Sequence, residues 1–184
     1  MPQRDTLVRS LHDLGLAAWF GGTLMGTIGL NGGAASAASS DERLKIAARG
    51  WSVWAPVQWT AIVLHGVGGL GLIRGNKVRL VGQLESRRNT QVKTVVTGLA
   101  VASSLGSAIA GKVMSDRSHE PAEGVTEPAA SASSDLKGAQ RIQRVLQWTT
   151  PALTAVLIVL AAQPGEQQRP IKGLFRTTLD NFRR

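Results

Sequence analysis

The stretch from Val53 to Ile73, VWAPVQWTAIVLHGVGGLGLI, has no charged side chain and is long enough to cross the hydrocarbon core of a bilayer as one helix. Three other stretches are also mostly apolar and of comparable length, at about residues 7–30, 94–111 and 145–164. Each of them predicts a membrane-spanning helix. The sequence thus predicts an all-α fold, with a four-helix transmembrane bundle in residues 1–165.

The alternative is a soluble four-helix bundle, which would need a polar stripe along each helix at the 3.6-residue period. The segments Ile62–Ile73 and Leu153–Ala162 are apolar or small on every side. Lipid is therefore the expected surrounding of these helices.

The first span has a competing interpretation, because it resembles a secretory signal with a small-residue cleavage site at Ala35 to Ala37. His12 and Asp13 interrupt its apolar run, and the uncharged part from Leu14 to Leu30 is longer than that of most signals. We therefore expect a retained helix.

The composition excludes some kinds of site and favours a membrane surface. The 184 residues contain no cysteine, which excludes disulfides and thiolate metal sites. The formal net charge is +9, and the excess lies mainly in segments that flank the apolar runs. This placement fits a lipid bilayer with anionic head groups better than it fits nucleic acid, so no nucleic-acid partner is expected.

The orientation follows from the basic residues near the ends of the spans, since Lys and Arg are retained on the cytoplasmic side. Thirteen of the 21 lie on the side of the two termini and of the connection between the second and third spans; the other eight lie on the opposite side. The thirteen are Arg4, Arg9, Arg74, Lys77, Arg79, Arg87, Arg88, Lys93, Arg169, Lys172, Arg176, Arg183 and Arg184. We predict a multi-pass protein of the bacterial plasma membrane with both termini cytoplasmic.

Tryptophans agree with this orientation. Trp51, Trp54 and Trp59 cluster at the start of the second span and Trp148 at the start of the fourth, so all four are expected near the outer interface that indole rings prefer.

The two outer loops receive different predictions. Ser39 and Glu42 have the spacing of a capping box, which predicts a short surface helix through about Arg49. Residues 115–134 are rich in Ser, Ala, Glu and Pro and have almost no large apolar residue, so a mobile extracytoplasmic linker is expected.

His12 and His65 are the candidate cofactor-binding residues, because ionisable groups inside a membrane are costly and often functional. Their expected depths differ by only about 5 Å at 1.5 Å per residue. They could face each other and hold a haem iron or a metal, or relay a proton. The other interpretation is that each imidazole hydrogen-bonds a neighbouring helix.

Small residues recur every fourth position in the first and third spans, which lets helix backbones approach closely in lipid. The pattern predicts helix packing within the chain or an oligomer interface, and does not distinguish them. The residues concerned are Ala18, Gly22, Gly26, Gly98, Ala102, Gly106 and Ala110.

The tail, residues 166–184, is predicted to be a basic amphipathic helix on the inner membrane surface. Its apolar face includes Phe175 and Phe182, and its basic residues include Lys172, Arg176 and Arg183. Docking of this helix to a cytoplasmic partner is the alternative.

The run from Leu11 to Gly22, LHDLGLAAWFGG, resembles the opening helix of small four-helix membrane proteins, namely the copper-resistance D-type membrane domain and its relatives. His12, Trp19, Gly21 and Gly22 are the corresponding positions. The layout also resembles uncharacterised actinobacterial membrane proteins of this size. Copper handling is not implied, since the chain offers no Met-rich or multi-His extracytoplasmic site.

No catalytic constellation stands out, so we expect a non-enzymatic membrane protein without a cofactor, acting as an accessory or assembly subunit or as a homo-oligomer. The alternative is a haem- or metal-linked redox or transport protein that uses His12 and His65. A small channel is less favoured, because the spans offer few polar residues to line a pore.

Overall fold

A computed structural model of the chain describes residues 6–75 and 84–167, and within these the side chains of residues 84–86 and 163–167 are not described. Every regular element in this part of the chain is helical. The elements are α1 (Thr6–Met25), the π-helical turn η1 (Gly26–Leu30), α2 (Asn31–Ala35), α3 (Ser40–Gly75), α5 (Leu84–Asp116) and α6 (Ser134–Gln167). The predicted tail helix, with Lys172, Phe175, Arg176, Phe182 and Arg183, lies outside the described residues.

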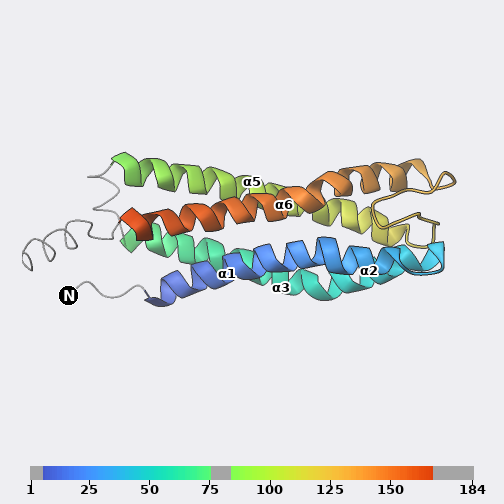
Figure 1. Cartoon of the computed structure of the whole chain (residues 1–184), viewed down its shortest axis with the longest axis horizontal. Helices are drawn as coiled ribbons and strands as arrows, with labels where there is room; N and C mark the ends of the chain where they lie inside the picture. Colours follow the sequence, from blue (N-terminus) through green and yellow to red (C-terminus); the bar gives the residue numbers. More distant parts are fainter. Residues whose placement is uncertain (1–5, 76–83, 168–184) are drawn as a thin grey trace, which may run out of the picture.

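The helices form one elongated bundle made of two antiparallel hairpins (Figure 1). The continuous run of α1, η1 and α2 packs along α3, and α5 packs along α6; α1 against α6 is the main contact between the hairpins. The start of α1, the end of α3, the start of α5 and the end of α6 lie together at one end of the bundle. The two described loops, residues 36–39 and 117–133, lie at the other end.

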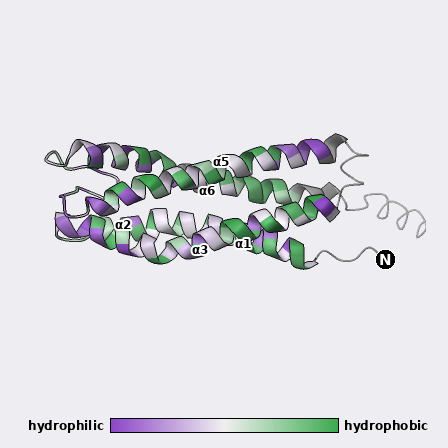
Figure 2. Ribbon diagram, turned by 180° about the vertical axis from the view of Figure 1, so that it is seen from behind, coloured by the Kyte–Doolittle hydropathy of each residue, from purple (hydrophilic) through white to green (hydrophobic). Residues whose placement is uncertain are grey.

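Three of the helical segments are long and apolar enough to cross a membrane: Ser40–Gly75, Arg87–Asp116 and Ser134–Ala162. They contain the predicted spans 53–73, 94–111 and most of 145–164. In the first span the apolar run is divided between α1 and the π-turn η1. Figure 2 shows hydrophobic residues along the middle of the bundle and hydrophilic residues toward both ends, at the loop end and at the start of α5.

The long helices are longer than the hydrocarbon core of a bilayer is thick. The 36 residues of α3 rise about 54 Å, against a hydrocarbon core of roughly 30 Å. The short surface helix predicted near residues 39–49 is therefore the first part of α3, because nothing interrupts the helix between Ser40 and the apolar run. We call residues 31–50 and 110–144, at the loop end, the head, and the other described residues the body.

The head has its own apolar core, which consists mainly of alanines. Leu44, Met114, Val125 and Leu136 are buried there together with Ala34, Ala47, Ala110, Ala122, Ala132 and Ala139. The loop of residues 117–133 contributes directly, and an isolated antiparallel bridge joins Ala122 to Pro128. This packing differs from the mobile linker expected at residues 115–134. The expectation came from the lack of large apolar side chains, but alanines that fit closely against helices are buried as completely.

The core of the body is smaller and is centred on one large side chain. Trp19 has no exposed surface and packs with Ala61 and Ala100. The indole Nε1 of Trp19 donates a hydrogen bond to Oγ of Ser104 at 3.1 Å, which ties α1 to α5. The hydroxyls of Ser103 and Thr150, 2.7 Å apart, connect α5 to α6 at a nearby level. Polar side chains thus join helices inside the apolar part of the bundle.

Candidate functional site

The structure brings His12 and His65 together, as their predicted depths allowed. The two imidazole rings stack with centroids 4.0 Å apart and planes inclined by 21°. Nδ1 of His12 donates to the backbone oxygen of His65 at 2.9 Å, and Nδ1 of His65 donates to the backbone oxygen of His12 at 3.1 Å. Because a carbonyl oxygen only accepts, both Nδ1 atoms must carry a proton. We call this reciprocal arrangement the histidine clasp.

Two glycines make the clasp possible by letting the backbones of α1 and α3 meet. A Cβ atom on Gly15 would lie 2.5 Å from the oxygen of Ala61 and 2.6 Å from the nitrogen of His65. A Cβ atom on Gly68 would lie 2.5 Å from the nitrogen of His12. These neighbours are backbone atoms, which cannot move aside as a flexible side chain would.

The clasp leaves little room for a haem between its histidines. Two imidazoles that ligate one haem iron approach it from opposite faces of the macrocycle. The rings of His12 and His65 are instead in stacking contact, and each Nδ1 is engaged by the opposite helix. Within residues 6–75 and 84–167 no three or more His, Cys, Asp or Glu side chains converge to hold a metal ion. The geometry therefore favours the helix-packing interpretation of the pair.

The predicted packing residues fall into two groups. Gly22 and Gly26 lie under the rings of Trp54 and Trp51, where a Cβ atom would collide with the indoles. Ala18 packs against the body core, Gly106 faces Leu146, and Ala110 is buried in the head core. Gly98 and Ala102, by contrast, are exposed on the outer face of α5, and nothing lies within 4 Å of a Cβ atom added to Gly98.

Only part of the predicted stripe of small residues faces the interior of the bundle in α5. The buried residues of that helix include Ala100, Ser103 and Ser104, which are offset from the predicted stripe. Polar serines face the interior because Trp19 and Thr150 offer them hydrogen bonds. A pattern search that counts only small apolar residues does not identify the serine-lined side of α5 as buried.

Two of the four tryptophans predicted near the outer interface pack on glycines of the first helical run. Trp51 packs on Gly26 and its Nε1 donates to Oδ1 of Asn31 at 2.9 Å. Trp54 packs on Gly22, and its buried Nε1 has no hydrogen-bond partner in the described chain. Trp148 is 53% exposed.

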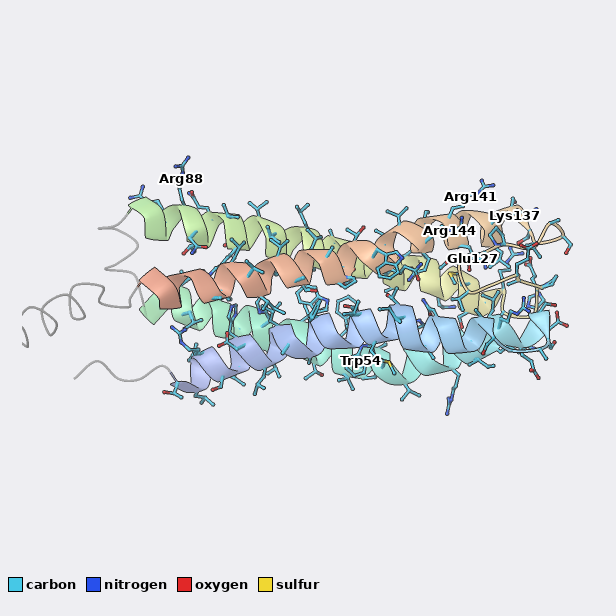
Figure 3. All side chains as sticks on the ribbon, in the orientation of Figure 1. Trp54, Arg88, Glu127, Lys137, Arg141 and Arg144 are labelled. Atoms are coloured by element: carbon cyan, nitrogen blue, oxygen red, sulfur yellow. The ribbon has the colours of Figure 1, made fainter. Side chains whose placement is uncertain are left out.

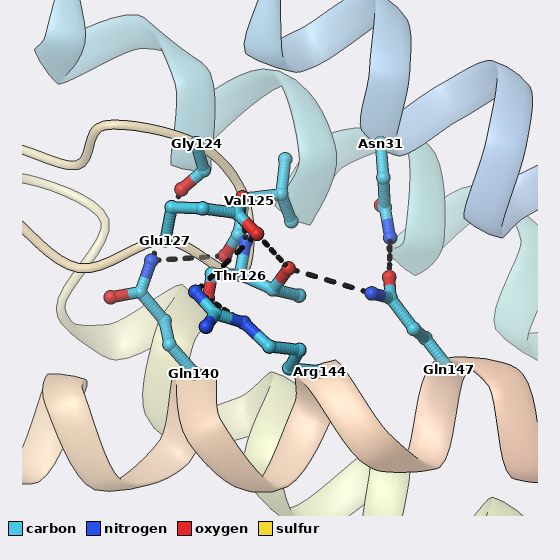
Figure 4. Close-up of polar contacts among 8 residues, drawn as sticks. All are labelled: Asn31, Gly124, Val125, Thr126, Glu127, Gln140, Arg144 and Gln147. Carbon is cyan, nitrogen blue, oxygen red and sulfur yellow. Dashed lines mark hydrogen bonds and ion pairs between the residues drawn. The ribbon is translucent and has the colours of Figure 1, made fainter.

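A polar network joins the head to the body (Figure 4). Gln140 has no exposed surface, and its Nε2 donates to the backbone oxygens of Gly124 and Val125 at 3.1 and 3.0 Å. Nη2 of Arg144 donates to the oxygen of Thr126 at 2.8 Å and also lies 3.5 Å from a carboxylate oxygen of Glu127. The first part of α6 therefore holds the backbone of the 117–133 loop.

Gln147 extends this network to the first hairpin. Its Nε2 lies 3.4 Å from Oγ1 of Thr126, and its Oε1 accepts a hydrogen bond from Nδ2 of Asn31 at 3.0 Å. The hydroxyl of Thr27, in the π-turn, lies 2.8 Å from the backbone oxygen of Gln147. A π-turn re-aims the side chains of a helix, and this one directs Thr27 toward α6.

Sequence reasoning missed this network. The available signal was the spacing of Gln140, Arg144 and Gln147, which places three polar residues on one face of a helix. The hydrogen-bond partners of that face are mostly backbone oxygens of the loop. Every residue has a backbone oxygen, so the sequence does not indicate which ones are bound.

A second polar group fixes the base of the same loop. Glu120 accepts hydrogen bonds from the backbone nitrogen and the hydroxyl of Ser133, at 2.7 and 3.0 Å, and from Arg117 at 3.3 Å. The Ser133 backbone N–H is the main reason why the pKa of Glu120 is below its ordinary value, with further contributions from the Ser133 hydroxyl and Arg117. Arg117 also pairs with Asp135 at 2.6 Å.

The chain matches no protein-family model, and searches of curated proteins and of solved structures found no significant match to it. The resemblance of residues 11–22 to the copper-resistance D-type membrane domain therefore stays a prediction.

Proposed function

We propose that this chain is a non-enzymatic integral membrane protein that acts by associating with other membrane proteins, as an accessory or assembly subunit or as a homo-oligomer. The observation that supports this is the outward-facing part of the small-residue stripe. Gly98 and Ala102 are exposed on α5 beside Val95 and Leu99, which are 62% and 54% exposed. A second helix can approach such a surface closely, which is how helices associate in lipid.

The proposed membrane arrangement has four spans, with α1 and η1 forming the first. This segment packs along α3 over its length and buries Trp19 in the body core. An even number of spans places both chain ends on one side, in agreement with the shared end of the helices in Figure 1. The excess of Lys and Arg in the terminal and central segments supports a cytoplasmic location of that end.

The alternative, a haem- or metal-linked protein, has the proximity of His12 and His65 in its favour but not their ring geometry. It predicts a visible absorption band or a bound metal in the protein purified from its membrane, lost in a His65→Ala variant. A colourless, metal-free protein with an unchanged phenotype in that variant would exclude it.

The association proposal is tested by the mass of the protein in native-lipid nanodiscs. Gly98→Leu with Ala102→Leu should reduce the associated fraction at least tenfold, because leucines hold the helices apart. Gly21→Leu is the matched control, since nothing lies within 4 Å of its added Cβ atom and it is exposed on α1. Lone monomers of the unchanged protein, with no copurifying partner, would contradict the proposal.

A further inference from the structure

The cations of the body differ from those of the head in having no carboxylate to pair with. The ion pairs among the described side chains all lie in the head, where they involve Lys112, Arg117 and Arg144. The described side chains of the body include a single acid, Asp13, which takes part in none of these pairs. All the described cations of the body lie near the end of the bundle where α1 and α5 start and α3 ends. They are Arg9, Arg74, Arg87, Arg88 and Lys93.

Lys93 is half-buried, whereas the other four cations are exposed. It precedes Ser104 by eleven residues, about three turns of helix, so it lies on the face of α5 that meets Trp19 of α1. Arg9 precedes Trp19 by ten residues, and α1 and α5 start at the same end of the bundle. Both cations therefore lie roughly 15 Å from the contact of Trp19 with Ser104, toward that end. Arg9 and Asp13 are accordingly the charged groups that act on Lys93.

Asn89 adds an acceptor without a donor, one turn closer to the same end. Its Oδ1 is buried and has no hydrogen-bond partner within the described chain. Asn89 is four residues before Lys93, so the two side chains lie on one face of α5. A buried oxygen without a donor and a half-buried ammonium without a counter-ion are both unfavourable. A ligand that brings an anion to Lys93 and a hydrogen-bond donor to Asn89 would relieve both.

The depth of these residues corresponds to lipid head groups. Lys93 directly precedes the predicted span 94–111, and Arg9 lies near the start of the first span. In the proposed orientation both cations lie at the phosphates of the inner leaflet, and Asn89 lies about 6 Å nearer the cytoplasm. A phosphate at this level accepts charge-assisted hydrogen bonds from both cations. The part of the head group beyond the phosphate then lies at the level of Asn89.

We propose that Arg9, Lys93 and Asn89 bind one phospholipid with an anionic, hydroxyl-bearing head group, of which phosphatidylglycerol is an example. The two cations bind the phosphate, and a hydroxyl of the head group donates to Oδ1 of Asn89. The lipid thus adds a link between α1 and α5 to the contact of Trp19 with Ser104. The site requires the chain to lie in a bilayer, and it does not depend on the association of Gly98 and Ala102 with other subunits.

The phosphate contact is tested by removing one cation. Each protein is purified in nanodiscs that contain phosphatidylglycerol and phosphatidylcholine in equal amounts, then released and weighed by native mass spectrometry. We expect the unchanged protein to retain one phosphatidylglycerol and Lys93→Gln to retain about fivefold less, which corresponds to roughly 1 kcal/mol for one basic residue at the membrane surface. Arg88→Gln is the matched control, since Arg88 is an exposed cation of the same helix that points away from the bundle in Figure 3. Equal retention by the two variants would overturn the proposal, as would equal retention of the two lipids by the unchanged protein.

The head-group contact is tested with phosphatidylmethanol, which has the same charge as phosphatidylglycerol but no hydroxyl. The unchanged protein should prefer phosphatidylglycerol by about threefold, the order of one hydrogen bond, and Asn89→Ala should lose this preference. Equal retention of these two lipids by the unchanged protein would contradict the role of Asn89.

A third measurement separates a lipid from a soluble phosphate. Glycerol phosphate added to the protein in phosphatidylcholine nanodiscs should not be retained, and its retention would overturn the assignment to a lipid. The variant with Gly98→Leu and Ala102→Leu should retain phosphatidylglycerol as the unchanged protein does, which separates this site from the proposed subunit surface.

Discussion

The body and the head of this bundle are held together in different ways. In the body, α1 and α3 meet backbone to backbone at Gly15 and Gly68, and the histidine clasp bonds each ring to the other helix. In the head, an alanine core is covered by a loop whose carbonyl oxygens are held by side chains of α6. In lipid the hydrophobic effect does not drive helices together, so helix association depends on close backbone approach and hydrogen bonds. In water the burial of apolar surface is itself favourable.

The largest expected effect comes from opening the closest approach in the body. A Gly68→Leu substitution places side-chain atoms where the backbone of His12 lies, so α1 and α3 must separate. We expect a loss of about 3 kcal/mol in the free energy of unfolding, the upper part of the usual range for overpacking. Thermal unfolding in detergent, followed by the helical circular dichroism signal, measures it.

Gly66→Leu is the control on the same helix, since nothing lies within 4 Å of its added Cβ atom. Equal melting temperatures for Gly68→Leu and Gly66→Leu would contradict the close approach of α1 and α3 at Gly68.

In the head, the corresponding change removes the side chain that holds the loop. Gln140→Met keeps the approximate size of the residue but leaves the oxygens of Gly124 and Val125 without the amide that binds them. We expect a loss of about 2 kcal/mol, from the cost of buried acceptors that lose their donor. Because the loss is local, limited proteolysis between residues 117 and 133 should accelerate more than global unfolding does.

Arg141→Met serves as its control, because Arg141 is the exposed neighbour of Gln140 and points away from the bundle in Figure 3. A loop that stayed as resistant in Gln140→Met as in this control would show that α6 does not hold it.

The same contrast explains how much of the structure the sequence could predict. Uncharged runs such as Val53–Ile73 mark helices through composition alone, and the depths of His12 and His65 follow from counting residues along them. The length of α3 was harder to predict, because the charged segment Ser40–Ser52 belongs to the same helix and precedes its apolar run. Its first third packs in the head and the rest in the body.

The head was not predictable, because its core is built from residues that carry a weak signal. Ala122 and Ala132 are buried in the loop, yet their small side chains do not stand out in a segment rich in Ser, Glu and Pro. Gln140 binds backbone oxygens, which every residue has. The serine-lined side of α5 was missed for a similar reason, since Ser104 is buried only because Trp19 reaches it.

A smaller effect is expected at that contact, which joins the two hairpins in the body. Ser104→Ala removes the acceptor of the Trp19 indole N–H while leaving the packing almost unchanged. A buried donor left without a partner costs about 1 to 2 kcal/mol. The melting temperature in detergent should fall accordingly, and Ser107→Ala on the same helix should fall less. Equal shifts of the melting temperature in the two variants would contradict a stabilising role of the hydrogen bond between Trp19 and Ser104.

The smallest expected effect is a pH dependence of the head, which comes from Glu120 and which the body should lack. The pKa of Glu120 in the folded head is below its ordinary value of 4.5, chiefly because the Ser133 backbone N–H binds the carboxylate. A depressed folded pKa means that the contribution to stability is present above about 4.5 and is lost as the pH falls through the lower, folded value. Proteolysis of the 117–133 loop by an acid-active protease should therefore accelerate as the pH falls below 4.5, while the helical circular dichroism signal of the protein stays constant.

In Glu120→Gln, which has no charge to lose, the loop should be cut at a rate that no longer depends on this titration. Glu123→Gln, an exposed change in the same loop, should keep the dependence of the unchanged protein. If the dependence survived in Glu120→Gln, another group would have to anchor the base of the loop, and the contact between Glu120 and Ser133 would not be what holds the head closed.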